Sequence, residues 1–183
     1  MENKFTTEER KAVFKQYMEP VWHLITPELC SYLDHAGFFE APASTKYHYS
    51  YHGGLFDHSL NVMNSLVELT KERNLVWSRP ESPYIIGMFH DLCKIDNYIY
   101  DLHSDSFQYN STQIFGGHGD KSIILLSQFM TLTAEEILCI YYHMGAFVEK
   151  EEWSKYTAAI HCYPNVLYTH TADMIATHIM EVE

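Results

Sequence analysis

Apolar residues recur at intervals of three and four along most of the chain, which is typical of amphipathic helices. Val13, Phe14, Tyr17 and Val21 show this spacing near the N-terminus. Thr6 and Thr133 each precede a glutamate by three residues, the spacing of a capping box, and so mark two helix starts. The same reasoning predicts further helices over residues 26–37, 55–73, 82–93, 117–130 and 163–180.

Turn-forming residues separate these segments. Residues 40–54 (EAPASTKYHYSYHGG) are the best candidate for a long loop, and 96–117 predicts a short β-hairpin. His161 is placed in the loop before the last predicted helix, and His170, three residues before Asp173 on one helical face, is a candidate partner of that carboxylate. The 183 residues suit one domain. We therefore predict an all-α, single-domain helical bundle, in which helices of residues 1–44 pack on a main domain formed by 45–183.

The composition indicates an ordinary globular protein, with 46% hydrophobic residues. No apolar run has the length of a signal peptide or a membrane span, which predicts a soluble, cytoplasmic protein without a membrane partner. The four cysteines lie far apart without a CxxC spacing, and we expect free, buried thiols that take no part in a site.

The formal charge of −12 makes binding of extended nucleic acid unfavourable, because a long phosphate backbone would be repelled. A small anionic substrate remains compatible with an acidic protein when bound cations reverse the local field. Twelve histidines are also many for this length.

Histidines and aspartates stand at or near apolar helix faces, where burial is costly unless they are paired or bind a metal. Taken singly, each is more often a satisfied core or cap residue. Together they match the way helical bundles build metal sites from inward side chains on facing helices. Imidazole and carboxylate suit Mn, Fe, Ni, Co or Zn. The candidate ligands are His58, His90, Asp91, His118, His143 and Asp173.

His90 and Asp91 are adjacent, and neighbouring side chains on a helix diverge by about 100°. They converge on a metal more easily at a helix end. Lys94, three residues later, would then lie near the same site and neutralise part of a phosphate's charge. A solvated surface lysine is the alternative for Lys94.

The order His58, His90-Asp91, Asp173 resembles the HD superfamily of metal-dependent phosphohydrolases, over about residues 45–178. The sequence around these residues most resembles the HD domain of YhaM-type 3′–5′ exoribonucleases. The resemblance lies in the segments YHYSYHGGLFDHSLNV, HDLCKI, GGHGDKS, YYHMG and THTADMIAT. The resemblance implies one metal held by His58, His90, Asp91 and Asp173. It also implies a second ion, bridged by Asp91 and bound by His118 and His143.

The function that the resemblance implies is a phosphodiesterase acting on a nucleotide or short oligonucleotide. A metal lowers the pKa of bound water toward 7 and so supplies hydroxide. We assign Asp91 and Lys94 to catalysis, and His48, His52 and Lys121 to substrate binding. Tyrosines beside His48 and His52 could stack on a base. The protein could form a homodimer.

Two other functions stay open at this stage. Some HD proteins of this ligand pattern are oxygenases in which a di-iron pair activates O₂. A non-catalytic HD domain that binds a nucleotide or a protein is the other alternative. The motif also reads HDLCK where HDLGK is typical of the family, which places Cys93 at a glycine position. We expect this change to be mild.

Overall fold

Both capping boxes begin a helix in the computed structural model, which describes residues 5–45 and 49–181. Thr6 precedes α1 (Thr7–Tyr17) and Thr133 precedes α6 (Ala134–Tyr141). In each box the hydroxyl accepts from the backbone N–H of the glutamate, and the glutamate accepts from the backbone N–H of the threonine. These two local signals are confirmed.

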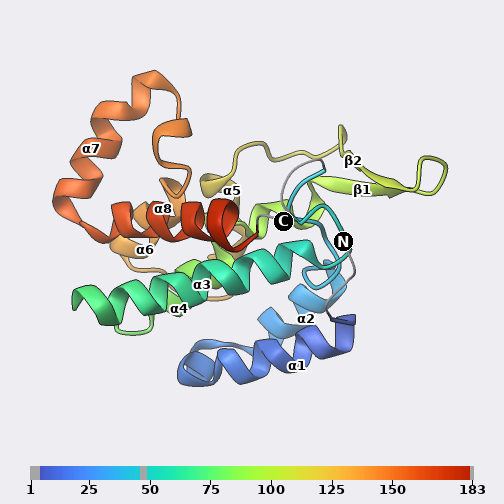
Figure 1. The fold of residues 1–183 in the computed structure, drawn as a ribbon, viewed down its shortest axis with the longest axis horizontal. Helices are drawn as coiled ribbons and strands as arrows, with labels where there is room; N and C mark the ends of the chain where they lie inside the picture. Colours follow the sequence, from blue (N-terminus) through green and yellow to red (C-terminus); the bar gives the residue numbers. More distant parts are fainter. Residues whose placement is uncertain (1–4, 46–48, 182–183) are drawn as a thin grey trace.

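The all-α prediction is confirmed as well (Figure 1). The other α-helices are α2 (Pro27–His35), α3 (Gly54–Arg73), α4 (Ser82–Phe89), α5 (Gly119–Leu126), α7 (Trp153–Cys162) and α8 (Asn165–Ile175). Short 3-10 helices are η1 (Glu19–Leu24), η2 (Leu92–Asp96), η3 (Gly145–Phe147) and η4 (Lys150–Glu152), and α8 continues into a π-helical turn, η5 (Ala176–Met180).

The first predicted helix is shorter than its pattern. It ends at Tyr17 and continues as η1, because Pro20 has no N–H to donate and blocks α-helical continuation. Phe14 and Val21 are buried as their spacing indicates, whereas Tyr17 is 40% exposed. The buried face of α1 passes from Phe14 to the C-cap residue Met18, which is fully buried, and leaves Tyr17 outside it.

Residues 153–162 form a helix, α7, where we predicted a loop, so His161 is helical. The helix has no side-chain N-cap, and Ala159 is its only residue classed as buried. Without a cap or an apolar stripe, the sequence carried no helix signal there. The predicted β-hairpin is present as β1 (Tyr98–Asp101) and β2 (Ser106–Tyr109), paired antiparallel.

The core is built around α3 and α4, which pack closely because of Gly87. A Cβ at Gly87 would lie 2.3 Å from the Cα of Met63 in α3. Rings of the N-terminal helices enter the same core, as in the edge-on contact of Phe14 with Phe89, with centroids 6.3 Å apart. Within the described residues, no helix is both long and apolar enough to cross a membrane.

A buried ion pair fixes the first turn of α3 to α1. Arg10 is 1% exposed, and its Nε and Nη2 donate to the two carboxylate oxygens of Asp57 at 2.9 and 2.8 Å. The hydroxyl of Tyr51 also donates to Asp57, at 3.0 Å. This contact holds the residue immediately before His58.

A second buried polar group, the Glu136 cluster, joins α4 to α6. We define it as Glu136 with Arg79, Ser82 and Thr133. The carboxylate accepts two bonds from the guanidinium of Arg79, at 3.0 and 2.6 Å, and one from the hydroxyl of Ser82, at 2.8 Å. Ser82 is the first residue of α4, and its hydroxyl joins that helix to the cluster.

Candidate metal centre

The six candidate ligands come from separate elements that meet at one place. His58 lies on α3, Asp173 on α8, and His90-Asp91 at the junction of α4 and η2. The side chains of His58, His90, Asp91 and His143 are at most 3% exposed. Helices α3 and α8 lie side by side, and α8 also contacts α6 (Figure 1). We call the six residues, with Lys94, the Asp91 cluster.

Asp91 lies at the centre, and its two oxygens face different partners. Oδ2 is 3.6 Å from Nε2 of His58 and 3.5 Å from Nε2 of His90. Oδ1 is 3.5 Å from Nε2 of His143 and 4.0 Å from Nδ1 of His118. The carboxylate therefore separates the histidines into two pairs, one at each oxygen.

His90 and His143 are held in the tautomer that a metal requires. Nδ1 of His90 lies 2.9 Å from the carbonyl oxygen of Gly87, and Nδ1 of His143 lies 2.7 Å from that of Ile140. A carbonyl only accepts, so Nδ1 carries the proton and Nε2 of the neutral ring presents a lone pair. Both Nε2 atoms are buried, and neither has a hydrogen-bond partner among the described residues.

His58 is oriented from both sides. Its Nε2 lies 3.3 Å from Asp173, and its Nδ1 lies 3.0 Å from Oε1 of Glu181. Burial disfavours the imidazolium, but the hydrogen bonds to Asp173 and Glu181 outweigh it and raise the pKa of His58 to about 9. Burial favours the neutral carboxyl of Asp173, but the hydrogen bond from His58 outweighs burial and lowers the pKa of Asp173. A carboxylate behind a ligand histidine is the usual way to fix its ring.

Glu181 was not predicted. It lies just after η5, and its side chain is fully buried. The amide of Asn61 also donates to it, at 3.1 Å. A single glutamate beyond the last predicted helix carries no periodic signal, and 123 positions separate it from its partner His58.

Lys94 is buried against Asp91 instead of being a solvated surface residue. Its Nζ lies 2.6 Å from Oδ2 of Asp91, and its side chain is 10% exposed. Burial opposes the charge of both groups. Their mutual attraction outweighs it, so the pKa of Lys94 is raised and that of Asp91 is held well below its usual range, with His90 adding to the latter effect.

The charged groups of this cluster pair with one another. Lys94 faces Asp91, and His58, whose raised pKa favours the imidazolium, faces Asp173 and Glu181. A divalent cation could take the place of the proton on Nε2 of His58 and use the free lone pairs of His90 and His143.

Three sets of residues each have ligand atoms that lie within 4.8 Å of one another, which is close enough for one set to share an ion. They are His58, His90 and Asp91; His90, His143 and Asp173; and Asp91, Cys93 and His118. The buried histidine and aspartate side chains can therefore hold metal ions. His143 belongs to the second set, and its Nε2 also lies 3.5 Å from Oδ1 of Asp91, a member of the third set.

His118 is the exposed member of the cluster, with a side chain 45% exposed. It precedes α5, whose start packs against α6 because a Cβ on Gly119 would lie 2.5 Å from the carbonyl oxygen of Ile140. A cleft of about 280 Å³ opens here, lined by His118, Tyr141, Met144, Phe147 and the acidic residues Asp120, Glu149 and Glu152, among others. His118 thus connects the buried cluster to the surface.

Two of the residues assigned to substrate binding, His52 and Lys121, have other contacts in the structure. The ring of His52 packs on the β-hairpin, 4.7 Å from the ring of Tyr100. Lys121 is 1% exposed, and its ammonium contacts Asp96, Asn97 and Gln113. His48 lies outside the described residues. These three assignments remain predictions.

The cysteines differ from the expectation in two respects. Cys93 and Cys139 are buried, but Cys162 is exposed and Cys30 is half-buried. Cys93 also lies inside the site, with Sγ 3.7 Å from Nδ1 of His118. Our expectation that the thiols lie outside the site is therefore wrong for the position of Cys93. Its place two residues after Asp91 is the feature of the sequence that indicates this position.

His170 was weighed as a partner of Asp173 because both lie on one face of α8. Its Nδ1 instead bonds the backbone carbonyl of His143, at 2.8 Å. It therefore fixes the chain after α6, where His143 stands.

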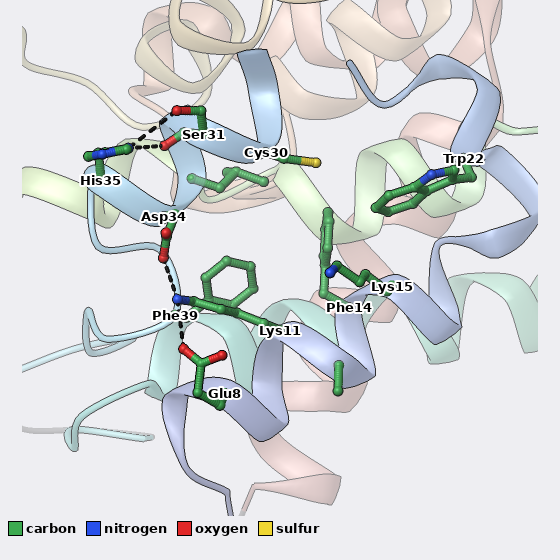
Figure 2. A pocket seen from close by; sticks show the side chains of 12 residues that line it. Glu8, Lys11, Phe14, Lys15, Trp22, Cys30, Ser31, Asp34, His35 and Phe39 are labelled. Carbon is green, nitrogen blue, oxygen red and sulfur yellow. Dashed lines mark hydrogen bonds and ion pairs between the residues drawn. The ribbon is translucent and has the colours of Figure 1, made fainter. Parts of the chain in front are cut away.

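A larger cavity, of about 460 Å³, lies between α1 and α2 (Figure 2). Lys11 crosses it to bond Glu8 and Asp34, and the rings of Phe14 and Phe39 form its apolar part. It shares no residue with the Asp91 cluster and is therefore separate from the candidate metal site.

No protein-family profile, curated protein or solved structure matches this chain. The geometry of the Asp91 cluster and the motifs in the sequence are therefore what indicate a function.

Proposed function

We propose that the protein is a metal-dependent phosphohydrolase of the HD type, a phosphodiesterase that acts on a nucleotide or short oligonucleotide. The observation that carries the proposal is the division of Asp91, whose Oδ2 faces His58 and His90 while Oδ1 faces His143 and His118. A carboxylate placed in this way can bridge two ions. Paired ions are the usual means of cleaving phosphodiesters without a protein nucleophile.

The ligand sets follow from that division. His58, His90, Asp91 and Asp173 would hold one ion, and Asp91, His118 and His143 the other. The residues fit this use, because the buried Nε2 atoms of His90 and His143 have no hydrogen-bond partner among the described residues and each lies 3.5 Å from the carboxylate of Asp91. When bound, such ions polarise the phosphoryl oxygens and activate water.

The protein's own residues have distinct tasks in this proposal. Lys94 neutralises Asp91 in the metal-free cluster at 2.6 Å. In the loaded site its ammonium is free to pair with a phosphoryl oxygen. Asp173 and Glu181 hold the ring of His58 in place. His48 and His52 would contact the substrate from the loop before α3, and Lys121 from α5.

The cleft beside His118 favours a small substrate. Asp120, Glu149 and Glu152 line it and would repel a second or third phosphate, as would the net charge of −12. The exposed ring of Phe147 offers a stacking surface for a base. We place the activity in the cytoplasm, and a homodimer is compatible with it.

The test compares two chromogenic substrates with metal-loaded protein. With Mn²⁺ added, we expect hydrolysis of bis-p-nitrophenyl phosphate to exceed that of p-nitrophenyl phosphate. Loss of all activity after chelation, and its return with Mn²⁺, would support the proposal. If neither ester is cleaved by fully loaded protein, while an iron-loaded sample consumes O₂, oxygenase chemistry replaces it.

A further inference from the structure

Cys93 belongs to a triangle of ligand atoms at the outer side of Asp91. Its Sγ lies 3.7 Å from Nδ1 of His118 and 4.0 Å from Oδ1 of Asp91, and those two atoms are 4.0 Å apart. A tetrahedral ion with bonds of about 2.0–2.3 Å has ligand atoms about 3.3–3.8 Å apart. The triangle is therefore only slightly wider than the spacing that an ion would impose.

A fourth ligand atom points to the same place. Nε2 of His143 is buried, has no hydrogen-bond partner within the described part of the chain, and lies 3.5 Å from the same Oδ1 of Asp91. This lone pair is independent of the thiol. It indicates that the outer side of Asp91 is built to receive a cation.

The position of the sulfur is set by the fold. Cys93 lies in η2 and is fully buried, and its backbone N–H donates to Oγ of Ser122 in α5 at 3.0 Å. This bond ties the turn that carries Asp91 and Cys93 to the helix that follows His118. The thiol and the imidazole are thereby kept on the same side of Asp91.

We propose that Cys93 binds the second ion as a thiolate, together with Asp91, His118 and His143. This inference rests on the proposed function, whose second ion it describes more closely. Binding would form a metal–sulfur bond and release the thiol proton to solvent, with no change of oxidation state. A thiolate prefers Zn²⁺, Co²⁺ and Fe²⁺ over Mn²⁺. The two ions would then differ, with a softer metal at the Cys93 side.

The consequence separates this chain from the HD proteins that it resembles. The HDLGK motif of that family has no side chain at this place, so its second ion is bound by nitrogen and oxygen alone. Here a sulfur ligand is added two residues after the bridging aspartate. The chain should therefore retain Zn²⁺ or Co²⁺ at low metal concentrations that leave a nitrogen–oxygen site empty.

Cobalt spectroscopy tests the ligand directly, because a thiolate bound to Co²⁺ gives an intense charge-transfer band in the near ultraviolet. We expect the band when metal-free wild-type protein is titrated with Co²⁺, and we expect its loss in Cys93→Ser and Cys93→Ala. Cys139→Ala is the matched control, since Cys139 is also fully buried but lies in α6 outside the cluster. It should keep the band.

Metal selectivity gives a second readout. In Cys93→Ser the affinity for Zn²⁺ should fall about 10–100-fold, as for loss of a supporting group at a metal site, while that for Mn²⁺ changes little. Two bound Co²⁺ ions without the band in wild-type protein would overturn the thiolate ligand and leave the proposed function standing. If no Co²⁺ binds to folded wild-type protein, the proposed function fails first. The wild-type spectrum decides even if a variant does not fold.

Discussion

Two buried carboxylates, Glu136 and Asp91, have opposite surroundings. Glu136 accepts from Arg79, Ser82 and a backbone N–H, so donors satisfy it within the fold. Asp91 has Lys94 as a donor, and around it stand histidines whose buried lone pairs have no donor among the described residues. Donors within the fold satisfy Glu136, whereas the Asp91 cluster could hold a cation.

The largest expected difference concerns activity. Asp91→Asn keeps the shape of the side chain but removes the bridging charge, so we expect hydrolysis to fall to background and metal content to fall with it. Far-ultraviolet circular dichroism should show the helices retained. Asp101→Asn, in the exposed hairpin, serves as the matched control. Normal turnover by Asp91→Asn would remove Asp91 from the mechanism.

A substitution in the Glu136 cluster should instead lower the stability of the fold. Glu136→Ala leaves Arg79 without its partner and should lower the free energy of unfolding by about 3 kcal/mol. Because Arg79 is partly exposed, water recovers some of that loss. Urea denaturation measures the change. The metal content of the folded fraction should be unaltered, and reduced metal binding there would show that the two clusters are not separate.

Metal should stabilise the fold through the Asp91 cluster alone. At an ion concentration of 100 times the dissociation constant, the free energy of unfolding should rise by about 2.7 kcal/mol, and chelation should reverse it. Thermal unfolding with and without Mn²⁺ measures this. Glu136→Ala should gain as much as the wild type, whereas Asp91→Asn should gain almost nothing. Equal gains in all three would indicate binding at some other surface.

A smaller effect is expected at Glu181, which orients His58 without facing Asp91. Glu181→Gln retains a hydrogen-bond acceptor but loses the charge, and metal affinity should fall about 10–100-fold. Isothermal titration with Mn²⁺ measures it. As a control, Glu152→Gln changes a carboxylate that lines the cleft beside His118, and it should leave the affinity for Mn²⁺ within a factor of about two. An unchanged affinity in Glu181→Gln would reduce Glu181 to a packing role.

Local signals predicted the parts of the fold that depend on neighbouring residues. The capping boxes at Thr6 and Thr133 and the Thr26–Pro27 start of α2 involve atoms a few residues apart. The helix α7 was missed because it lacks both a cap and a wide apolar face. Pro20 ended α1 earlier than the apolar spacing indicated.

In the site, too, the sequence predicted individual residues but not the contacts between residues far apart in the chain. Side-chain type and placement at or near apolar helix faces were enough to select His58, His90, Asp91 and Asp173, which the structure brings together. The pairing of Arg10 with Asp57 spans 47 positions, and that of His58 with Glu181 spans 123. Such contacts arise from packing, and no periodicity or motif announces them.

The metal content of the purified protein tests the central claim most directly. After dialysis with saturating Mn²⁺ and removal of unbound metal, elemental analysis should find about two ions per chain in the wild type, about one in His118→Ala and none in Asp91→Asn. A wild-type protein that is folded and holds no metal under these conditions would contradict the account.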